Sequence, residues 1–187
     1  MEDRHYPTVS DQTRNEVWHA FWSAKRCAAY YQSLHRRFTV LHQVATGLMI
    51  ILGSGSFLSA FFLATVGRTS LPEWMVYVLL GLGVLLAIVS AISMVGNHAS
   101  KGAIALSIAK ECDGVVRRFS NLMSEIDGGD INESRARLEL TRILQDVSAI
   151  TYRSGDIGIV DNERLNRVAA DQATDELTAL YGQMNFH

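Results

Sequence analysis

The sequence has few cysteines, no excess of positive charge and two long stretches without charged side chains. Its formal net charge is −2 over 187 residues, which excludes a broadly basic surface and makes nucleic acid a poor partner. The two cysteines, Cys27 and Cys112, have neither the number nor the spacing of a zinc site. No Ser/His/Asp, Cys/His or paired-carboxylate arrangement has supporting context, so we expect no enzyme, no cofactor and no metal.

The two uncharged stretches cover residues 38–67 and 74–100. A helix of about 20 apolar residues spans the core of a bilayer, and both stretches are longer than that. We therefore predict an all-α membrane protein with transmembrane helices near residues 44–66 and 75–97. Only a short loop around Pro72 separates them, so they form an antiparallel hairpin.

Two other interpretations of these stretches are weaker. A soluble bundle with two buried helices rarely needs two uncharged helices of this length. A cleaved signal peptide would begin earlier in the chain and would be shorter.

Basic residues lie at one end of the predicted hairpin. Those that flank it are Lys25, Arg26, Arg36 and Arg37 on one side and Lys101, Lys110, Arg117 and Arg118 on the other. The loop between the spans holds Arg68 alone. By the positive-inside rule both termini are cytoplasmic, and Trp74 and Tyr77 anchor the far interface. Both cysteines then lie on the reducing side and are expected as free thiols.

Apolar residues at alternating steps of four and three flank the hairpin on both sides. The stripes are Val17, Phe21, Ala24, Ala28, Tyr31, His35 and Phe38 before it and Ala105, Ile108, Cys112, Val115, Phe119, Leu122 and Ile126 after it. This spacing is typical of helices that pack as a coiled coil. We expect an N-terminal arm over residues 1–37, the hairpin over 38–100 and a cytoplasmic helical region over 101–187. Each arm should continue its span as one unbroken helix.

Two further helices are predicted after the second arm, which Asp127-Gly128-Gly129 ends with a left-handed glycine cap. Their apolar faces are Ala136, Leu140, Ile143, Val147 and Ile150 in one and Leu165, Val168, Ala169, Ala173, Leu177 and Leu180 in the other. We expect these faces to cover the arms. Residues with the character or spacing of N-terminal caps are Thr13 with Glu16, Asp130 with Glu133, and Asp161.

Small and hydroxylated side chains line one side of each predicted span. They are Thr46, Gly53, Ser56, Ala60 and Ala64 in the first span and Gly83, Ala87, Ser90 and Asn97 in the second. Small residues let helices approach closely in lipid, and packing alone is the interpretation that the spans favour. In the alternative, one stripe packs while the other lines a water-filled pore in an oligomer. Without a charged ring, such a pore is weakly selective.

Two pairs of ring-bearing residues each allow two roles. His42 and His98 are expected at the same depth, just inside the cytoplasmic interface. There, hydrogen bonds to headgroups or to each other are favoured over a charge switch or a metal. Trp18 and Trp22 stand about one helical turn apart. Either the C-terminal helices bury them or they form a docking patch for a partner, and burial is favoured.

The layout resembles the SLATT family of small bacterial two-transmembrane effectors, which are encoded beside cyclic-oligonucleotide synthases or nucleotide-sensing proteins in antiviral systems. The features that carry the resemblance are the Trp18-to-Arg37 stretch (WHAFWSAKRCAAYYQSLHRR), the short loop, and a second span that leaves through Asn97-His98 into a long helix. It covers roughly residues 15–180 and depends on architecture and residue character, without an invariant motif. The resemblance assigns no catalytic residue in this sequence.

The resemblance implies an inner-membrane assembly that permeabilises the membrane once a sensor is triggered, and this raises the pore above packing alone. This chain departs from the family pattern because it has no sensor domain of its own. We therefore expect a homo-oligomeric pore-forming effector whose partners are the lipid bilayer, further copies of itself and a sensor or nucleotide-signalling protein. The alternative is a membrane-anchored adaptor that recruits a cytosolic partner through its arms. A holin-like lesion protein shares the physics but does not need long arms.

Overall fold

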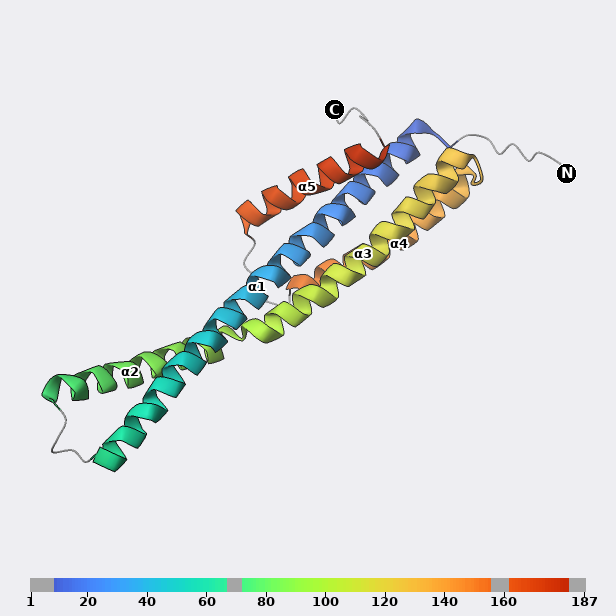
Figure 1. Ribbon diagram of the computed structural model, residues 1–187. Helices are drawn as coiled ribbons and strands as arrows, with labels where there is room; N and C mark the ends of the chain where they lie inside the picture. The colour runs from blue at the N-terminus through green and yellow to red at the C-terminus, as the bar shows by residue number, and fades with distance from the viewer. Residues whose placement is uncertain (1–8, 67–71, 156–161, 182–187) are drawn as a thin grey trace. The chain divides into compact units, whose positions relative to one another are not determined.

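The described part of the chain is almost entirely helical. The computed structural model describes residues 9–66, 72–155 and 162–181, and within these ranges it contains helices and no strand. The helices are α1 (Asp11–Val66), α2 (Glu73–Gly96), α3 (His98–Gly128), α4 (Glu133–Gly155) and α5 (Glu163–Tyr181) (Figure 1). The all-α prediction is confirmed for these residues.

The contacts divide the chain into two compact units. One, the helical unit, consists of Met1–His35 and Ala103–His187, and the other, the hairpin unit, is Arg36–Gly102. The division lies within about two residues of the limits 38 and 100 expected from the loss of charge along the sequence. The two units are described separately below.

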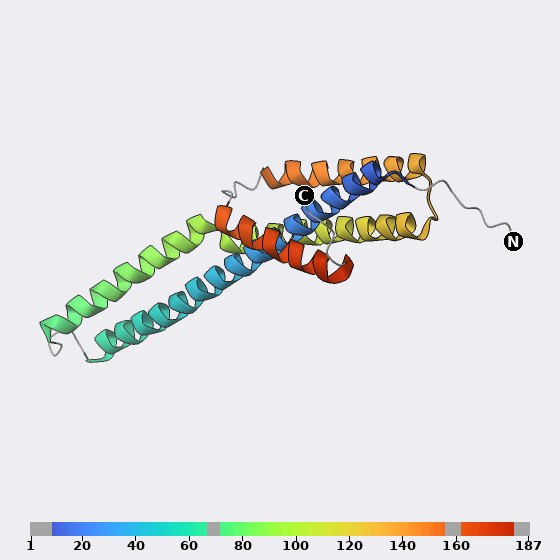
Figure 2. The ribbon, with the colours of Figure 1, turned by 90° about the horizontal axis from the view of Figure 1, so that it is seen from above.

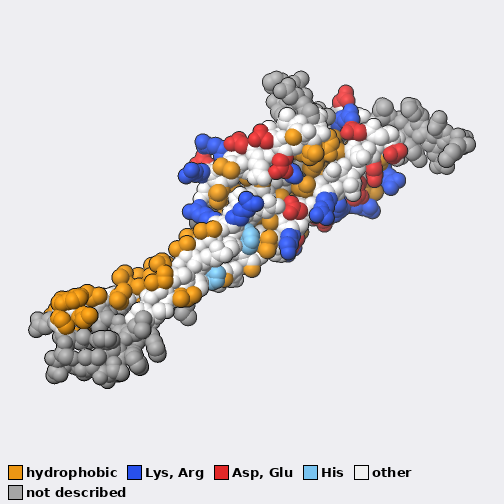
Figure 3. Space-filling view, in the orientation of Figure 1, with side chains coloured by type: hydrophobic (Ala, Val, Ile, Leu, Met, Phe, Trp, Pro, Cys, Tyr) orange, Lys and Arg blue, Asp and Glu red, His pale blue; other side chains and the backbone are white. Residues whose placement is uncertain are grey.

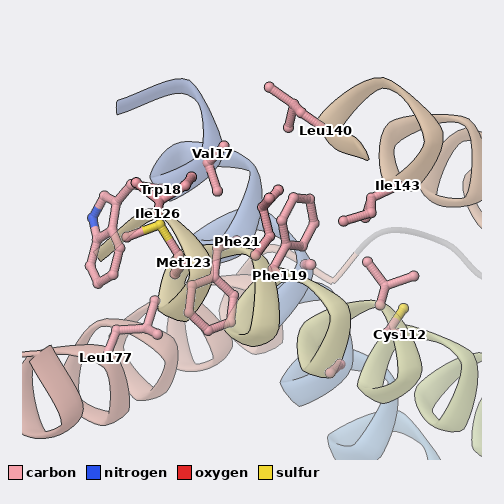
Figure 4. Packing of buried hydrophobic residues seen from close by; sticks show 14 of the residues in the cluster. Val17, Trp18, Phe21, Cys112, Phe119, Met123, Ile126, Leu140, Ile143 and Leu177 are labelled. Carbon is pink, nitrogen blue, oxygen red and sulfur yellow. The ribbon is translucent and has the colours of Figure 1, made fainter. Parts of the chain in front are cut away.

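The helical unit is built on the first part of α1 and on α3. The second stripe is buried there, as is the first from Val17 to Ala28, with Phe21 and Phe119 at the centre (Figure 4). Tyr31 and His35 of the first stripe are partly buried, and Phe38 belongs to the hairpin unit. Helices α4 and α5 lie on opposite sides of this pair (Figure 2). α4 contributes Leu140 and Ile143, and α5 contributes Leu177, whose side chain is fully buried.

The buried face of α5 is narrower than the sequence suggests. Ala169, Ala173 and Leu177 are fully buried, whereas Val168 is 51% exposed and Leu180 is 68% exposed. The three buried residues follow one another at steps of four, so they occupy a single narrow line on the helix. The predicted face was too wide because it counted every apolar residue within a broad arc.

The second span and the second arm are two helices, not the one continuous helix expected. Asn97 separates them with a left-handed backbone (φ 41°, ψ 40°), and its carbonyl accepts the first hydrogen bond of α3 from the N–H of Lys101 at 3.1 Å. Asparagine visits this conformation more readily than other residues with a Cβ. At Gly96, a Cβ would lie 2.5 Å from Nε2 of His98, so a larger residue there would displace the imidazole ring.

The helix caps differ from those predicted, except at the end of α3. Gly129 has a φ of 70°, and the N–H of Asp130 returns to the carbonyl of Glu125 at 3.0 Å, so the glycine cap is confirmed. The side chains that cap the starts of helices are Ser10 for α1, Asn132 for α4 and Asn162 for α5. Of the predicted caps, Thr13 lies inside the first turn of α1, and Asp130 lies two residues before the actual cap Asn132. Asp161 lies outside the described residues.

Candidate functional site

The hairpin unit exposes its apolar side chains instead of burying them. Between residues 36 and 100, none of the side chains that the structure describes is buried. Among its large apolar residues, Ile51 is 69% exposed, Leu80 is 63% exposed and Ile92 is 62% exposed. Hydrophobic side chains cover α2 in Figure 3, with no charged side chain among them. A soluble monomer rarely exposes an apolar surface of this extent.

Two helical stretches of the described chain are long and apolar enough to cross a membrane by length and composition. One lies in Asp11–Gly55 and the other in Trp74–Gly128, and neither apolar window is buried within the chain. The central helix of a soluble protein passes the same test of length and composition, but its apolar side chains are covered by the rest of the protein. Here they are uncovered.

Two hydroxyl groups of the hairpin find partners inside the hairpin. Ser54 donates a hydrogen bond to the carbonyl oxygen of Ile50, one turn earlier, at 2.7 Å. Ser90 of α2 donates to the sulfur of Met49 on α1 at 3.6 Å. Internal pairing of this kind removes the need for water at these two side chains.

The small residues of the two stripes are not packed against one another where the structure describes them. A Cβ added at Gly53 or Gly83 would meet nothing within 4 Å. Gly83, Ala87, Ser90 and Asn97 are exposed, and Thr46 and Gly53 are partly exposed. The side chains of Ser56, Ala60 and Ala64 lie outside the described part. Close packing within one chain therefore does not account for the described small residues.

The aromatic residues near the ends of the hairpin lie on its surface. Trp74 is 62% exposed and Tyr77 is 73% exposed. At the other end of α2, the ring of His98 stacks on Phe38, with centroids 6.1 Å apart and planes 23° apart. His42 is exposed. Across the described ranges, no group of three or more His, Cys, Asp or Glu side chains is placed to hold a metal ion.

In the helical unit, the arm residues named from the sequence lie in or against the core. Val17, Phe21, Ile108, Val115, Phe119 and Leu122 are buried, and Tyr31 packs against them while partly buried. Trp18 is 6% exposed and meets the ring of Tyr181 edge-on at 5.3 Å. Trp22 donates from its indole N–H to Thr174 of α5 at 3.0 Å. Both tryptophans are therefore packing residues here and do not form an open docking patch.

Polar contacts fasten α5 to α1. The ammonium group of Lys25 lies 2.7 Å from a carboxylate oxygen of Glu176, and this pairing lowers the pKa of Glu176. The guanidinium of Arg26 donates to the side-chain oxygen of Asn166 at 2.9 Å and lies over the ring of Trp22. Such partly exposed pairs fix register more than they add stability.

A second polar cluster joins the start of α4 to the start of α1. The carboxylate of Glu133 accepts hydrogen bonds from the backbone N–H of Ser10 at 2.8 Å and from the hydroxyl of Thr13 at 2.5 Å. Thr13 is fully buried. The hydrogen bonds from Thr13, Ser10 and Arg137 lower the pKa of Glu133 to about 2. The sequence pattern did not suggest this contact because its two partners are 120 residues apart.

Comparison with known proteins finds no relative of this chain. No family model, no curated protein and no solved structure matches the chain.

Proposed function

We propose that the chain is a homo-oligomeric pore-forming effector of the bacterial inner membrane. The observation that carries the proposal is the hairpin unit, whose described side chains are uncharged between residues 38 and 100 and unburied. Contact of such a surface with lipid tails carries no hydrophobic penalty, whereas its exposure to water costs free energy. The resemblance to the SLATT effectors supplies the biological role, which is permeabilisation of the membrane on a signal from a partner sensor.

The small residues support assembly of several copies. Gly83, Ala87 and Ser90 lie at steps of four and three on α2 and are exposed in the single chain. In lipid, a line of small side chains lets another helix approach. Ser90 adds a hydroxyl to this line, which offers a polar lining once it leaves its contact with Met49. A second chain at this line turns an exposed stripe into a helix contact or into the wall of a pore.

The charge distribution supports an orientation with both ends in the cytoplasm. Basic residues are more numerous on the two flanks of the hairpin than in the loop, which holds Arg68 alone. Trp74 and Tyr77 are exposed near the loop end of α2, at the depth where amphipathic rings prefer the interface. The helical unit then lies on the side on which a cytoplasmic sensor acts.

Activation requires two states of the assembly. A trigger shifts the balance between a closed and an open state only if it binds them with different affinity. The helical unit is the part of the chain with a packed core and a polar surface that such a trigger can contact.

The test is dye release from liposomes that contain the purified chain, together with the membrane potential of expressing cells. Wild-type protein should release dye and lower the potential. Ser90→Leu should slow release by placing an apolar side chain on the small-residue line. Ile92→Leu is the matched control, because it changes a side chain on the opposite side of α2. Sealed liposomes and an unchanged potential would refute the pore.

The same variant separates the pore from a membrane-anchored adaptor. An adaptor would hold its cytosolic partner through the helical unit and would tolerate Ser90→Leu without loss of function. A pore loses conductance while the helical unit stays folded, which circular dichroism verifies.

A further inference from the structure

The two cysteines of the chain meet inside the helical unit. Cys27 belongs to α1 and Cys112 to α3, and their sulfur atoms are 2.9 Å apart with both residues present as thiols. The sulfurs of a disulfide are about 2.05 Å apart, so bond formation requires an approach of less than about 1 Å. Cys112 is 3% exposed and Cys27 is partly buried.

The space around the sulfurs permits this approach. A cavity of about 10 Å³ lies against both cysteines and is otherwise lined by Ala24, Val115, Val147 and Ile150. Its walls are apolar and include the small side chain of Ala24, so a shift of less than about 1 Å by either sulfur meets no polar group. None of these neighbours competes for the thiols as a hydrogen-bond partner.

The surroundings give the two sulfurs different protonation. The hydrogen bond from Cys112 lowers the pKa of Cys27, and the positive charge of Arg26 lowers it further, against the effect of burial. The same hydrogen bond raises the pKa of Cys112, as do burial and the nearby carboxylates of Asp113 and Glu111. Cys27 is therefore the more acidic thiol of the pair and the one that supplies the attacking thiolate, whereas Cys112 gives up its proton less readily.

We infer that Cys27 and Cys112 are a peroxide-oxidised pair whose intramolecular disulfide pins α1 to α3. The observations that carry this inference are the 2.9 Å contact between sulfurs of two different helices and the cavity beside them. The site does not depend on the pore proposal, because the crosslink forms or fails within the helical unit.

The chemistry balances with one hydrogen peroxide. The Cys27 thiolate attacks one peroxide oxygen, the O–O bond breaks and hydroxide leaves, so the sulfur becomes a sulfenic acid. The Cys112 sulfur then attacks the Cys27 sulfur, and its proton passes to the departing oxygen, which leaves as water. Two electrons pass from the sulfurs to the peroxide, and a thiol-based reductant reverses the change.

The crosslink joins residues 85 positions apart and so encloses the whole hairpin in one covalent loop. Neither α4 nor α5 contributes a sulfur, although Val147 and Ile150 of α4 line the cavity beside the pair. Oxidation therefore acts directly on the separation of α1 and α3.

The test treats the reduced full-length chain in detergent with hydrogen peroxide, then blocks the remaining thiols with N-ethylmaleimide. Trypsin cuts after lysine and arginine, so residues 27–36 and 111–117 should appear as one linked peptide pair from the monomer band of a non-reducing gel. The oxidised chain should melt at a higher temperature, and dithiothreitol should reverse the change. Thiols that remain alkylated, or links found only in dimers, would overturn the inference.

Three variants refine the result. Cys27→Ser and Cys112→Ser should each abolish the linked pair and the rise in melting temperature. Arg26→Gln keeps both sulfurs, and it should slow the loss of free thiol several-fold because the thiolate loses its cation. Lys110→Gln, an exposed neighbour of Cys112 on α3, is the control and should leave the rate unchanged. Equal rates in the two charge variants would contradict the assignment of Cys27 as the attacking sulfur.

Discussion

Phe21 of α1 and Phe119 of α3 face each other at the centre of the helical unit, with ring centroids 6.1 Å apart and planes tilted by 31°. They are 2% and 0% exposed. Phe21 also meets Tyr181, the last residue of α5, edge-on at 6.0 Å. Two aromatic contacts of Phe21 thus join both arms and the C-terminal helix.

Truncation of this contact should destabilise the helical unit strongly. Phe119→Ala removes a fully buried ring and leaves a cavity, which costs about 3–5 kcal/mol. Leu144→Ala on α4, where the leucine is 44% exposed, should cost less than about 0.5 kcal/mol. Guanidinium unfolding of the full chain in detergent, followed by circular dichroism at 222 nm, measures both. Similar losses in the two variants would place the core elsewhere.

Acid should loosen the joint between α1 and α4. The pKa of Glu133 falls from 4.5 to about 2 in the folded chain, so its carboxylate stabilises the fold above pH 4.5. That contribution is lost as the pH falls through about 2. Glu133→Gln should lower the melting temperature at pH 7 and flatten its decline between pH 5 and pH 2.

The matched control for the acid experiment is Glu163→Gln. Glu163 also begins a helix, but its side chain is 91% exposed and its nearest cation, Arg167, is 3.6 Å away. This variant should follow the wild-type acid profile. An acid profile of Glu133→Gln identical to that of wild type would show that the cluster at Ser10 and Thr13 does not control acid stability.

A charge in the hairpin should block membrane insertion. Leu85 of α2 and Leu138 of α4 are 52% and 53% exposed in the structure, so exposure alone does not distinguish them. Leu85→Lys should raise the free energy of membrane insertion by about 2.5–3.5 kcal/mol. Leu138→Lys places its charge in water and should leave insertion unchanged. The fraction that resists carbonate extraction from membranes measures the difference. Equal membrane retention of the two variants would argue against lipid around α2.

Assembly should depend on one side of α2. Gly81 and Gly83 both have open space where a Cβ would stand, but two residues along a helix face nearly opposite directions. Gly83→Leu should reduce the oligomer seen by chemical crosslinking in membranes, because it fills the small-residue line. Gly81→Leu should leave the oligomer intact. The reverse pattern would move the contact between copies to the other side of the helix.

The features that follow from periodicity and composition were predictable from the sequence. Charge is absent over two stretches that are each long enough for a helix to cross a bilayer, and the expected limits 38 and 100 lie within about two residues of those of the hairpin unit. Stripes such as Ile108, Val115 and Leu122 identified the core, because burial of an apolar face repeats with the helical period. Gly129 was predictable as a cap because glycine pays no steric penalty at positive φ.

The features that depend on a single backbone angle or on distant partners were not predictable. The hydropathy falls close to Asn97, where the uncharged stretch ends at Ser100, but this fall predicts the end of the span and not a break in the helix. Glu133 finds Thr13 only once the tertiary structure forms. Cys112 falls on the predicted apolar stripe but Cys27 lies beside its own, so the spacing did not pair them. The exposure of Gly83 and Ser90 likewise needed three-dimensional coordinates.

The contact of Glu133 with Ser10 and Thr13 at the start of α1 has a consequence for biosynthesis. The ribosome makes Ser10 and Thr13 120 residues or more before it makes Glu133. While the hairpin leaves the ribosome, the beginning of α1 therefore lacks this acceptor. The arm is completed only after α4 is released, so the newly made chain passes through a stage in which its N-terminal turn depends on local hydrogen bonds alone.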